Sequence, residues 1–507
     1  MKSGLSRRSF LKVMGSSAAV GGFTLSGLSG ISRAFAAHRF QGVPTLSYIF
    51  PGAPQPDVAR VVEALNAYMA ERIGATIDLR AIEWGTFDTQ ISLINASAEP
   101  YDLVFTAPWI NNYYNNISQE YLAPLEGLLP ELAPGYWASL TPATWEAARV
   151  AGHIYGAPNQ QIFVKPFGPN IRTDLLEAIG LSDEFQALTS WDQLDPIMAA
   201  INEYVQTDDI LTHVTYNLAQ VVTPEAWNYD PQDFGLAVKG SDASAQVVIF
   251  SETDEYRQAA ELIRQWYVAG YSPSDQTLLA EMDQAWTAGL YGLRMADIVK
   301  PGGEAETAAR WGHAVTAKAI SQPMLTTGGV TATMYGLSSI SPNPELSVKF
   351  LELVNTDPVF YNTLCKGIEG VHWEWADEER LLIKPAGDAA SFADTGYSPN
   401  TDWMFGNVFN SYYTDESQVG AWPLTAELNR TAMPSPVLGF TFDRSAVETE
   451  ISSISAAMGE FSAPVNQGFI DPAEGITLLN QALRDAGIEA VRDEMQSQID
   501  AWKAANA

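Results

Sequence analysis

The sequence predicts an α/β fold built on a parallel sheet. Residues 46–50 form a short apolar run, and the Pro- and Gly-rich stretch 51–56 ends it. Residues 57–73 then carry apolar side chains at helical spacing, and 77–81 alternate as a second strand. The run 102–106 is predicted as a third strand. Because the carboxyl ends of parallel strands lie at one edge of a sheet, the loops after these strands should converge on a ligand site.

Start and stop signals predict three more helices. Asn343 caps the first and Pro344 occupies its first turn, Asp471 caps the second, and Gly487 separates the second from the third. Residues 368–445 are rich in Trp, Tyr, Asn and Gly and show little periodicity, which predicts irregular structure. With 46% hydrophobic residues, a chain of 507 can bury a large core, and its length suits two or three domains.

The amino terminus has the pattern of a twin-arginine export signal. The heptapeptide SRRSFLK contains Arg7 and Arg8, a weakly apolar stretch follows over 13–31, and Ala-Phe-Ala ends at Ala36. We expect cleavage after Ala36 and a periplasmic location. The stretch is broken by many Gly and Ser residues, which disfavours the alternative of a membrane anchor. No cysteine lies near the cleavage site, so we expect no lipid anchor.

The net charge of the chain argues against some classes of binding partner. The formal net charge is −32, and removal of residues 1–36, which hold five basic and no acidic side chains, takes it to −37. Such a surface repels phosphate backbones and anionic lipid, so nucleic acid and membrane surfaces are not expected partners. Solubility at high salt and binding of cations are both open explanations. Cys365 is the sole cysteine, which excludes an intramolecular disulfide and a cysteine metal cluster.

Signatures of catalysis are missing from the sequence. It contains no G-x-x-x-x-G-K loop, no G-x-S-x-G elbow and no H-E-x-x-H helix, and its five histidines are scattered. We therefore expect no catalytic residue, no metal and no cofactor. Sixty carboxylates leave a two-carboxylate glycosidase site open as an alternative.

Aromatic residues are abundant, with 14 Trp and 20 Tyr. Several tryptophans stand beside amides or carboxylates, as Trp84 does after Glu83 and Trp109 before Asn111. A flat apolar ring beside polar acceptors suits a sugar, which has an apolar face and a hydroxyl rim. Other tryptophans lie in helix-like segments and are expected to pack in the core. These are Trp137, Trp145, Trp191, Trp266 and Trp502.

Four motifs resemble the extracellular solute-binding proteins of ABC sugar importers. They are YDLVFT at 101–106, IYGAP at 154–158, SWDQL at 190–194 and SPNPE at 341–345. GIEGVHW at 367–373 and the segment 439–502 resemble the large LipO-type members. The resemblance implies a two-lobe periplasmic-binding-protein fold, type II-like, with a hinge and an interlobe cleft. LipO-type proteins usually carry a lipidated cysteine, whereas this sequence has a twin-arginine signal instead.

The resemblance also divides the chain and implies a site. After the signal at 1–36, lobe one would contain 43–157 and about 290–340, and lobe two 158–289 and 341–507. Ligand contacts would come from four places: lobe one, the first crossing segment, the point where the chain returns to lobe one, and lobe two. In that order they are Trp84, Trp109, Asn111 and Asn112; Asn159, Gln160 and Gln161; Asp297; and Glu369, Trp373 and Trp403.

The implied function is that of a periplasmic substrate-binding protein, without chemistry of its own. It would capture an oligosaccharide or glycoside in the cleft and deliver it, as a monomer, to the membrane permease subunits of an ABC importer. Two alternatives use the same sequence features. One is a secreted glycoside-active enzyme, and the other is a sugar-sensing receptor for a membrane signalling partner.

Overall fold

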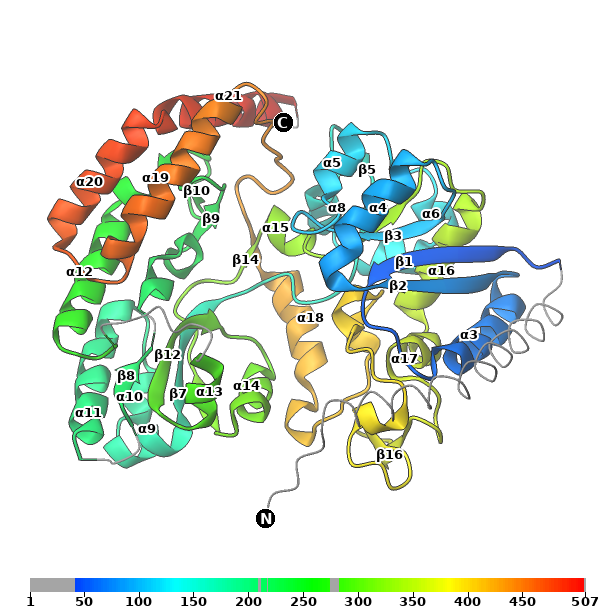
Figure 1. Ribbon diagram of the computed structural model, residues 1–507, viewed down its shortest axis with the longest axis horizontal. Helices are drawn as coiled ribbons and strands as arrows, with labels where there is room; N and C mark the ends of the chain where they lie inside the picture. The colour runs from blue at the N-terminus through cyan, green and yellow to red at the C-terminus, as the bar shows by residue number, and fades with distance from the viewer. Residues whose placement is uncertain (1–41, 208–210, 217, 274–281, 506–507) are drawn as a thin grey trace, which may run out of the picture.

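The computed structural model describes residues 42–207, 211–216, 218–273 and 282–505. The predicted export signal, with Arg7, Arg8 and the cleavage point after Ala36, lies outside these residues. Within them, no helix combines the length and the apolar character needed to cross a membrane. Two bodies stand side by side in Figure 1, and each has its own hydrophobic core.

Lobe one, on the right of Figure 1, is built on a five-stranded sheet of order β2-β1-β3-β15-β6. Its strands are β1 (Thr45–Pro51), β2 (Thr76–Ile82), β3 (Leu103–Thr106), β6 (Gly156–Pro158) and β15 (Met334–Leu337). β1 pairs in parallel with β2 and β3, whereas β15 is antiparallel to β3 and β6. The three predicted strands and the parallel pairing are therefore confirmed. The predicted helix after β1 is α3 (Val58–Arg72), and it buries Val61, Leu65 and Met69.

Helices cover the sheet of lobe one. They are α4 (Phe87–Ala96), α5 (Tyr113–Ser118), α6 (Leu129–Leu132), α7 (Pro134–Ser139), α8 (Pro142–Ala147), α16 (Pro344–Thr356) and α17 (Pro358–Lys366). The short pair β4 (Arg149–Val150) and β5 (His153–Ile154) precedes β6. Pro344 occupies the first turn of α16 as predicted, but the Asn343 side chain makes no capping hydrogen bond.

Lobe two contains two smaller sheets. One has the order β13-β7-β12-β8 and the other β11-β10-β9. The strands are β7 (Phe167–Arg172), β8 (His213–Thr215), β9 (Tyr229–Pro231), β10 (Leu236–Lys239), β11 (Val247–Ile249), β12 (Tyr291–Ile298) and β13 (Val315–Ala317). The helices are α9 (Thr173–Ile179), α10 (Ser182–Gln186), α11 (Asp195–Val205), α12 (Asp254–Val268), α13 (Met282–Thr287), α14 (Gly303–Trp311), α19 (Glu448–Asn466), α20 (Pro472–Asp485) and α21 (Ile488–Ala505).

The carboxyl-terminal helices follow the sequence prediction. The Asp471 carboxylate accepts hydrogen bonds from the backbone N–H groups of Ala473 and Glu474, which caps α20. Gly487 lies between α20 and α21 with φ of +91°, a left-handed conformation that glycine adopts without strain. Residues 368–445 hold β16 (Trp373–Asp377), β17 (Leu382–Pro385), several single 3₁₀ turns, α18 (Ala421–Thr431) and β18 (Met433–Pro434).

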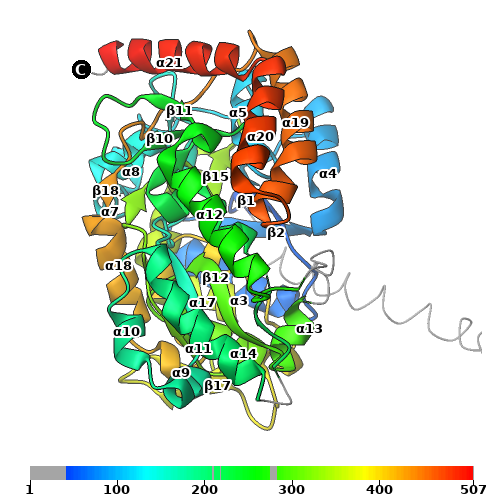
Figure 2. The same ribbon diagram turned by 90° about the vertical axis from the view of Figure 1, so that its left-hand side faces the viewer.

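Three segments connect the lobes. The first joins β6 to β7, the second joins β13 to β15 through β14 (Met324–Leu325) and α15 (Thr327–Val330), and the third contains α18 and β18. β14 and β18 pair in parallel, which ties two of the connections together. Figure 1 shows α18 between the lobes, and Figure 2 shows it along one edge of the molecule with α4 along the opposite edge. The Asn429 side chain of α18 binds the first connection, accepting from Phe163 N at 3.0 Å and donating to Gln161 O at 2.6 Å.

The structure differs from the predicted lobe boundaries. Residues 290–340 were expected in lobe one, but β12 pairs with β7 and β8 inside lobe two. Residues 341–507 were expected in lobe two, but α16 and α17 pack in the core of lobe one as far as Phe405. Val437 is the first residue after α18 in the core of lobe two. Pairing of β15 with β3 places the helices that follow β15 on lobe one, and no local pattern records that long-range pairing.

Candidate functional site

Three tryptophans from distant parts of the sequence meet at one edge of the sheet of lobe one. The ring centroids of Trp84 and Trp109 are 6.2 Å apart with planes inclined by 16°, and those of Trp84 and Trp403 are 6.0 Å apart at 19°. Trp109 and Trp403 are 6.4 Å apart at 34°. We call these three residues the tryptophan platform. The convergence of the loops after β2 and β3 is as the sequence predicted.

Local structure holds the platform in place. Trp84 begins a single 3₁₀ turn directly after β2, and Trp109 lies in the loop after β3. The Trp109 indole N–H donates to Ala332 O at 2.7 Å, and the Phe105 ring lies edge-on to Trp109 and Trp403. Trp84 remains 41% exposed and Trp109 55% exposed. The result is an oriented aromatic surface that is open to solvent, which suits the apolar face of a sugar ring.

Trp403 belongs to lobe one, whereas the prediction placed it in lobe two. The sequence assigned it to lobe two, facing Trp84 and Trp109 across a cleft. It instead packs against the core of lobe one, in the short helical turn Asp402–Met404. The chain does not cross to lobe two until after α18, so the segment that carries Trp403 stays with α16 and α17.

The first connection between the lobes brings polar groups to the platform. The Gln161 amide donates to Thr333 Oγ1 at 2.8 Å, and Thr333 Oγ1 donates to Trp403 O at 3.3 Å. The Gln160 amide is buried and donates to Asn355 Oδ1 at 3.1 Å, so it holds the segment in position. Asn159 is 1% exposed, and neither polar atom of its side chain has a hydrogen-bond partner among the described residues. Buried amides are normally paired, which makes Asn159 a candidate for binding water or ligand.

Asn111 and Asn112 shape the loop that carries Trp109. The Asn111 amide donates to Phe105 O at 2.8 Å, and this residue adopts a φ of +43°. The Asn112 side chain donates to Pro108 O and accepts from Asn115 N, which caps α5. Both residues line a cavity of about 440 Å³ beside Trp109. Their side-chain hydrogen bonds give them a positioning role in the loop.

Asp297 lies near the carboxyl end of β12, in lobe two. It accepts a hydrogen bond from the Asn170 amide at 2.9 Å and forms an ion pair with Arg294, whose Nε is 3.4 Å from Asp297 Oδ2. Asp297 and Gln161 line the same cavity of about 330 Å³. Gln161 therefore connects this cavity to the tryptophan platform, and we call the cavity the lobe-two cavity.

Two predicted residues belong to another part of lobe one. Trp373 is buried, donates its indole N–H to Gly367 O at 3.1 Å, and packs against Trp375 and Tyr412. Glu369 is exposed and pairs with Trp373 through an isolated backbone bridge. Among the described aromatic pairs Trp373 contacts none of the platform rings, and Glu369 is held beside Trp373, so these two residues form a group apart from Trp84.

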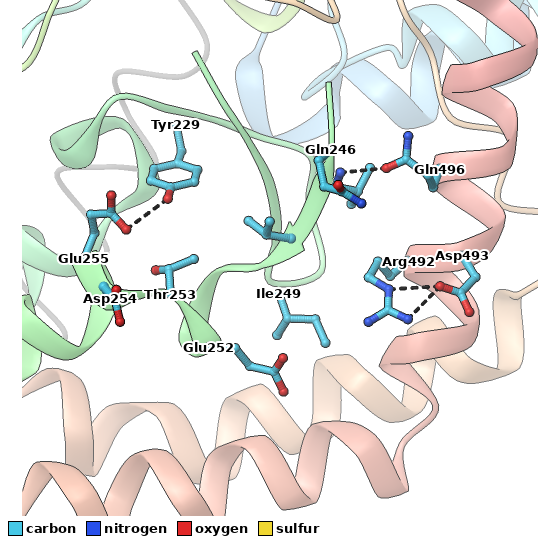
Figure 3. A pocket seen from close by; sticks show the side chains of 12 residues that line it. Tyr229, Gln246, Ile249, Glu252, Thr253, Asp254, Glu255, Arg492, Asp493 and Gln496 are labelled. Atoms are coloured by element: carbon cyan, nitrogen blue, oxygen red, sulfur yellow. Dashed lines mark hydrogen bonds and ion pairs between the residues drawn. The ribbon is translucent and has the colours of Figure 1, made fainter. Parts of the chain in front are cut away.

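A cavity of about 660 Å³ lies on lobe two between β11, α12 and α21 (Figure 3). Several of its polar side chains pair within the protein. The Tyr229 hydroxyl donates to Glu255, which also pairs with Lys239, and Arg492 donates to Asp493. None of its lining residues belongs to the connections between the lobes, so we place the candidate site at the platform and the lobe-two cavity.

Sequence reasoning missed Thr333 and the basic residues around Asp297. Thr333 is a buried threonine just before β15, close to the equally buried Thr331, and no motif surrounds it. Lys165, Arg294 and Lys300 line the lobe-two cavity, but more than a hundred residues of sequence separate Lys165 from the other two. Burial lowers the pKa of Lys165, nearby Glu225 raises it, and nearby Lys300 lowers it. Only the folded chain brings these groups together.

Comparison with known proteins gives a consistent result. A family model described as a domain of unknown function, DUF3502, matches residues 436–504. A protein of Streptococcus pneumoniae serotype 4, named carbohydrate ABC transporter substrate-binding protein, is 27% identical over 450 residues, which are 86% of this chain and 86% of that protein.

Solved structures share the fold. The N-glycan transport solute binding protein NgtS from Streptococcus pneumoniae has a TM-score of 0.77 at 22% identity, covering 92% of this chain and 100% of that chain. An HMO-binding, ABC-transporter-associated solute binding protein from Bifidobacterium longum infantis has a TM-score of 0.64 at 14% identity, covering 91% and 99%. The resemblance found in the sequence is therefore confirmed: the chain is similar over most of its length to the solute-binding proteins of ABC sugar importers, and it has their two-lobe α/β fold.

Proposed function

We propose that this protein captures an oligosaccharide or glycoside between its lobes for import by an ABC transporter. The tryptophan platform is the observation that carries the proposal. Three segments separated by up to about 300 residues place indole rings together at the edge of the sheet where ligands bind in α/β proteins. A core does not need such rings to be exposed, whereas a sugar-binding surface does.

Relatives support the same proposal. NgtS has been solved in complex with Man1GlcNAc and with Man5GlcNAc, and these complexes share the fold of this chain with TM-scores of 0.67 and 0.63. Binding there is a property of NgtS, and the platform provides this chain with a surface of suitable chemistry. We assign ligand contacts to Trp84, Trp109 and Trp403, with Asn159 and Gln161 at the connection.

The mechanism requires binding and closure. A sugar ring would stack on the platform, and hinge motion of the three connections would bring lobe two over it. Asn159, Gln161 and the lobe-two cavity would then offer polar groups to the hydroxyl rim. We propose that the ligand leaves unchanged and that the permease subunits of the importer receive it. The same proposal includes export by the twin-arginine route, cleavage after Ala36 and a monomeric periplasmic protein, which rest on the sequence motif.

Native mass spectrometry of the protein purified from its own cells tests the proposal. We expect a population of molecules whose excess mass equals one oligosaccharide, released on denaturation with its structure intact. A glycan array then identifies further ligands. Shortened products from an incubated oligosaccharide would support the alternative of a glycoside-active enzyme, and no glycan in either experiment would contradict the proposed function.

A further inference from the structure

We propose that the lobe-two cavity binds an anionic substituent of the sugar, a carboxylate or a sulfate group. This inference rests on the proposed function and names the class of saccharide. The cavity holds about 330 Å³ and is lined by residues of the first connection, β12 and α14. In Figure 1, β12 and α14 lie on the left-hand body, and α14 is on the side that faces α18.

Basic side chains concentrate at this cavity. Lys165, Arg294, Lys300 and Arg310 are four of its twelve lining residues, whereas the whole chain has 28 Lys and Arg among 507 residues. The net charge of the chain is −32. A cluster of cations in so acidic a protein is a local feature that solubility does not explain, since charge for solubility is spread over the surface.

Internal ion pairs use only part of this positive charge. Lys300 Nζ lies 2.5 Å from Glu306 Oε2, and Arg294 pairs with Asp297. Lys165 Nζ forms no ion pair or hydrogen bond with any residue that the structure describes, and the Glu225 carboxylate attracts it only from beyond ion-pair distance. Lys165 is an exposed residue of the lining, and a charge-assisted hydrogen bond from an ammonium group to an anion is roughly twice as strong as one between neutral groups. A carboxylate or sulfate beside Lys165 would supply that anion.

The ring of Trp311 holds two guanidinium groups of the cavity, those of Arg294 and Arg310, in position. Trp311 is 2% exposed, and the Arg294 guanidinium carbon lies 4.8 Å from its ring centroid while that of Arg310 lies 5.8 Å away. Cation–π contact restricts the orientations that these long side chains adopt. α14 also begins at this cavity, at Gly303, so the positive end of its dipole adds to the same potential.

The cavity and the platform are close enough for one ligand. Gln161 lines the cavity, and its amide reaches Thr333, which in turn contacts Trp403 of the platform. An oligosaccharide with one ring on the platform would therefore extend along Gln161 toward the cations. The stacked ring provides contact area, and the charged substituent at the other end provides discrimination between neutral and acidic chains.

The test uses oligosaccharides in matched pairs. Each neutral chain is compared with the same backbone carrying one uronate, and separately one sulfate, and dissociation constants are measured by calorimetry at low and high salt. We expect the acidic member of a pair to bind at least about tenfold more tightly, with a difference that shrinks as salt rises. Lys165→Gln should weaken binding of the acidic member about tenfold more than it weakens binding of the neutral member.

Lys503→Gln is the matched control. It changes net charge equally, but Lys503 lies on α21, where its ammonium donates to Ala243 O and Ser244 O. Equal binding of neutral and acidic members, or an equal effect of both variants on the acidic member, would overturn the inference while leaving sugar capture intact. Binding of no oligosaccharide at all would count against the proposed function, and this inference would fall with it.

Discussion

Trp109→Ala separates ligand binding from folding at the tryptophan platform. Truncation of an aromatic anchor in a binding site commonly costs about 2 kcal/mol or more, which is about 30-fold in affinity. Truncation of a fully buried Trp in a core costs about 3–5 kcal/mol of folding free energy. Trp109 is 55% exposed, so less than half of its surface contributes to the fold. The folding cost should accordingly be about 2 kcal/mol or less.

Trp502→Ala is the comparison variant. Trp502 lies on α21, is partly buried against the core of lobe two, and its ring is 6.0 Å from that of Phe440. Affinity is measured by calorimetry with a glycan identified on the array, and stability by denaturant unfolding without glycan. We expect Trp109→Ala to lose about 30-fold in affinity and Trp502→Ala to lose mainly stability. Retained affinity in Trp109→Ala, with a loss of stability, would show that the platform is a packing feature.

Three further predictions concern stability and export. Burial raises the pKa of the Asp230 carboxyl to about 7 in the folded protein. In the unfolded chain this carboxyl ionises near its usual pKa of about 4, so the free energy of unfolding should fall by up to about 4 kcal/mol as pH rises from about 4 to 7. Asp230→Asn should remove this decline in denaturant titrations, and an unaltered pH slope would contradict it. Asn429→Ala leaves the buried Phe163 N–H without its partner and should cost about 1–3 kcal/mol in the same assay; a loss below about 0.3 kcal/mol would refute this. Replacing Arg7 and Arg8 by Lys should retain the precursor in the cytoplasm on cell fractionation, and full export of that variant would reject the twin-arginine route.

Local signals in the sequence predicted the elements of lobe one. The apolar spacing of α3 and the alternation in β2 arise from burial of one face, which neighbouring residues determine. Lobe membership depended on pairings between distant strands. β15 joins β3 although more than 200 residues separate them, and β12 joins β7 rather than the sheet of lobe one. Such pairings result from whole-chain packing, and the boundaries drawn at 290–340 and 341–507 were wrong for that reason.

In the candidate site, too, local sequence signals predicted some features, while others depended on long-range packing. Trp84 and Trp109 could be predicted to approach each other because both follow parallel strands of one sheet. Trp403 could be identified as a candidate from its neighbours, but its lobe depended on where the third connection crosses. The cations of the lobe-two cavity had no signal in the sequence, because a single Lys or Arg in a surface segment is ordinary. Thr333 was missed because its contacts with Gln161 and Trp403 are made across connections.

Small-angle scattering with and without saturating oligosaccharide tests the central claim most directly. Capture between two lobes joined by three connections requires that ligand bring the lobes together. The account predicts a smaller radius of gyration in the presence of a glycan that binds by calorimetry, with the glycan recovered intact afterwards. An unchanged radius at saturation would contradict capture by closure between the lobes.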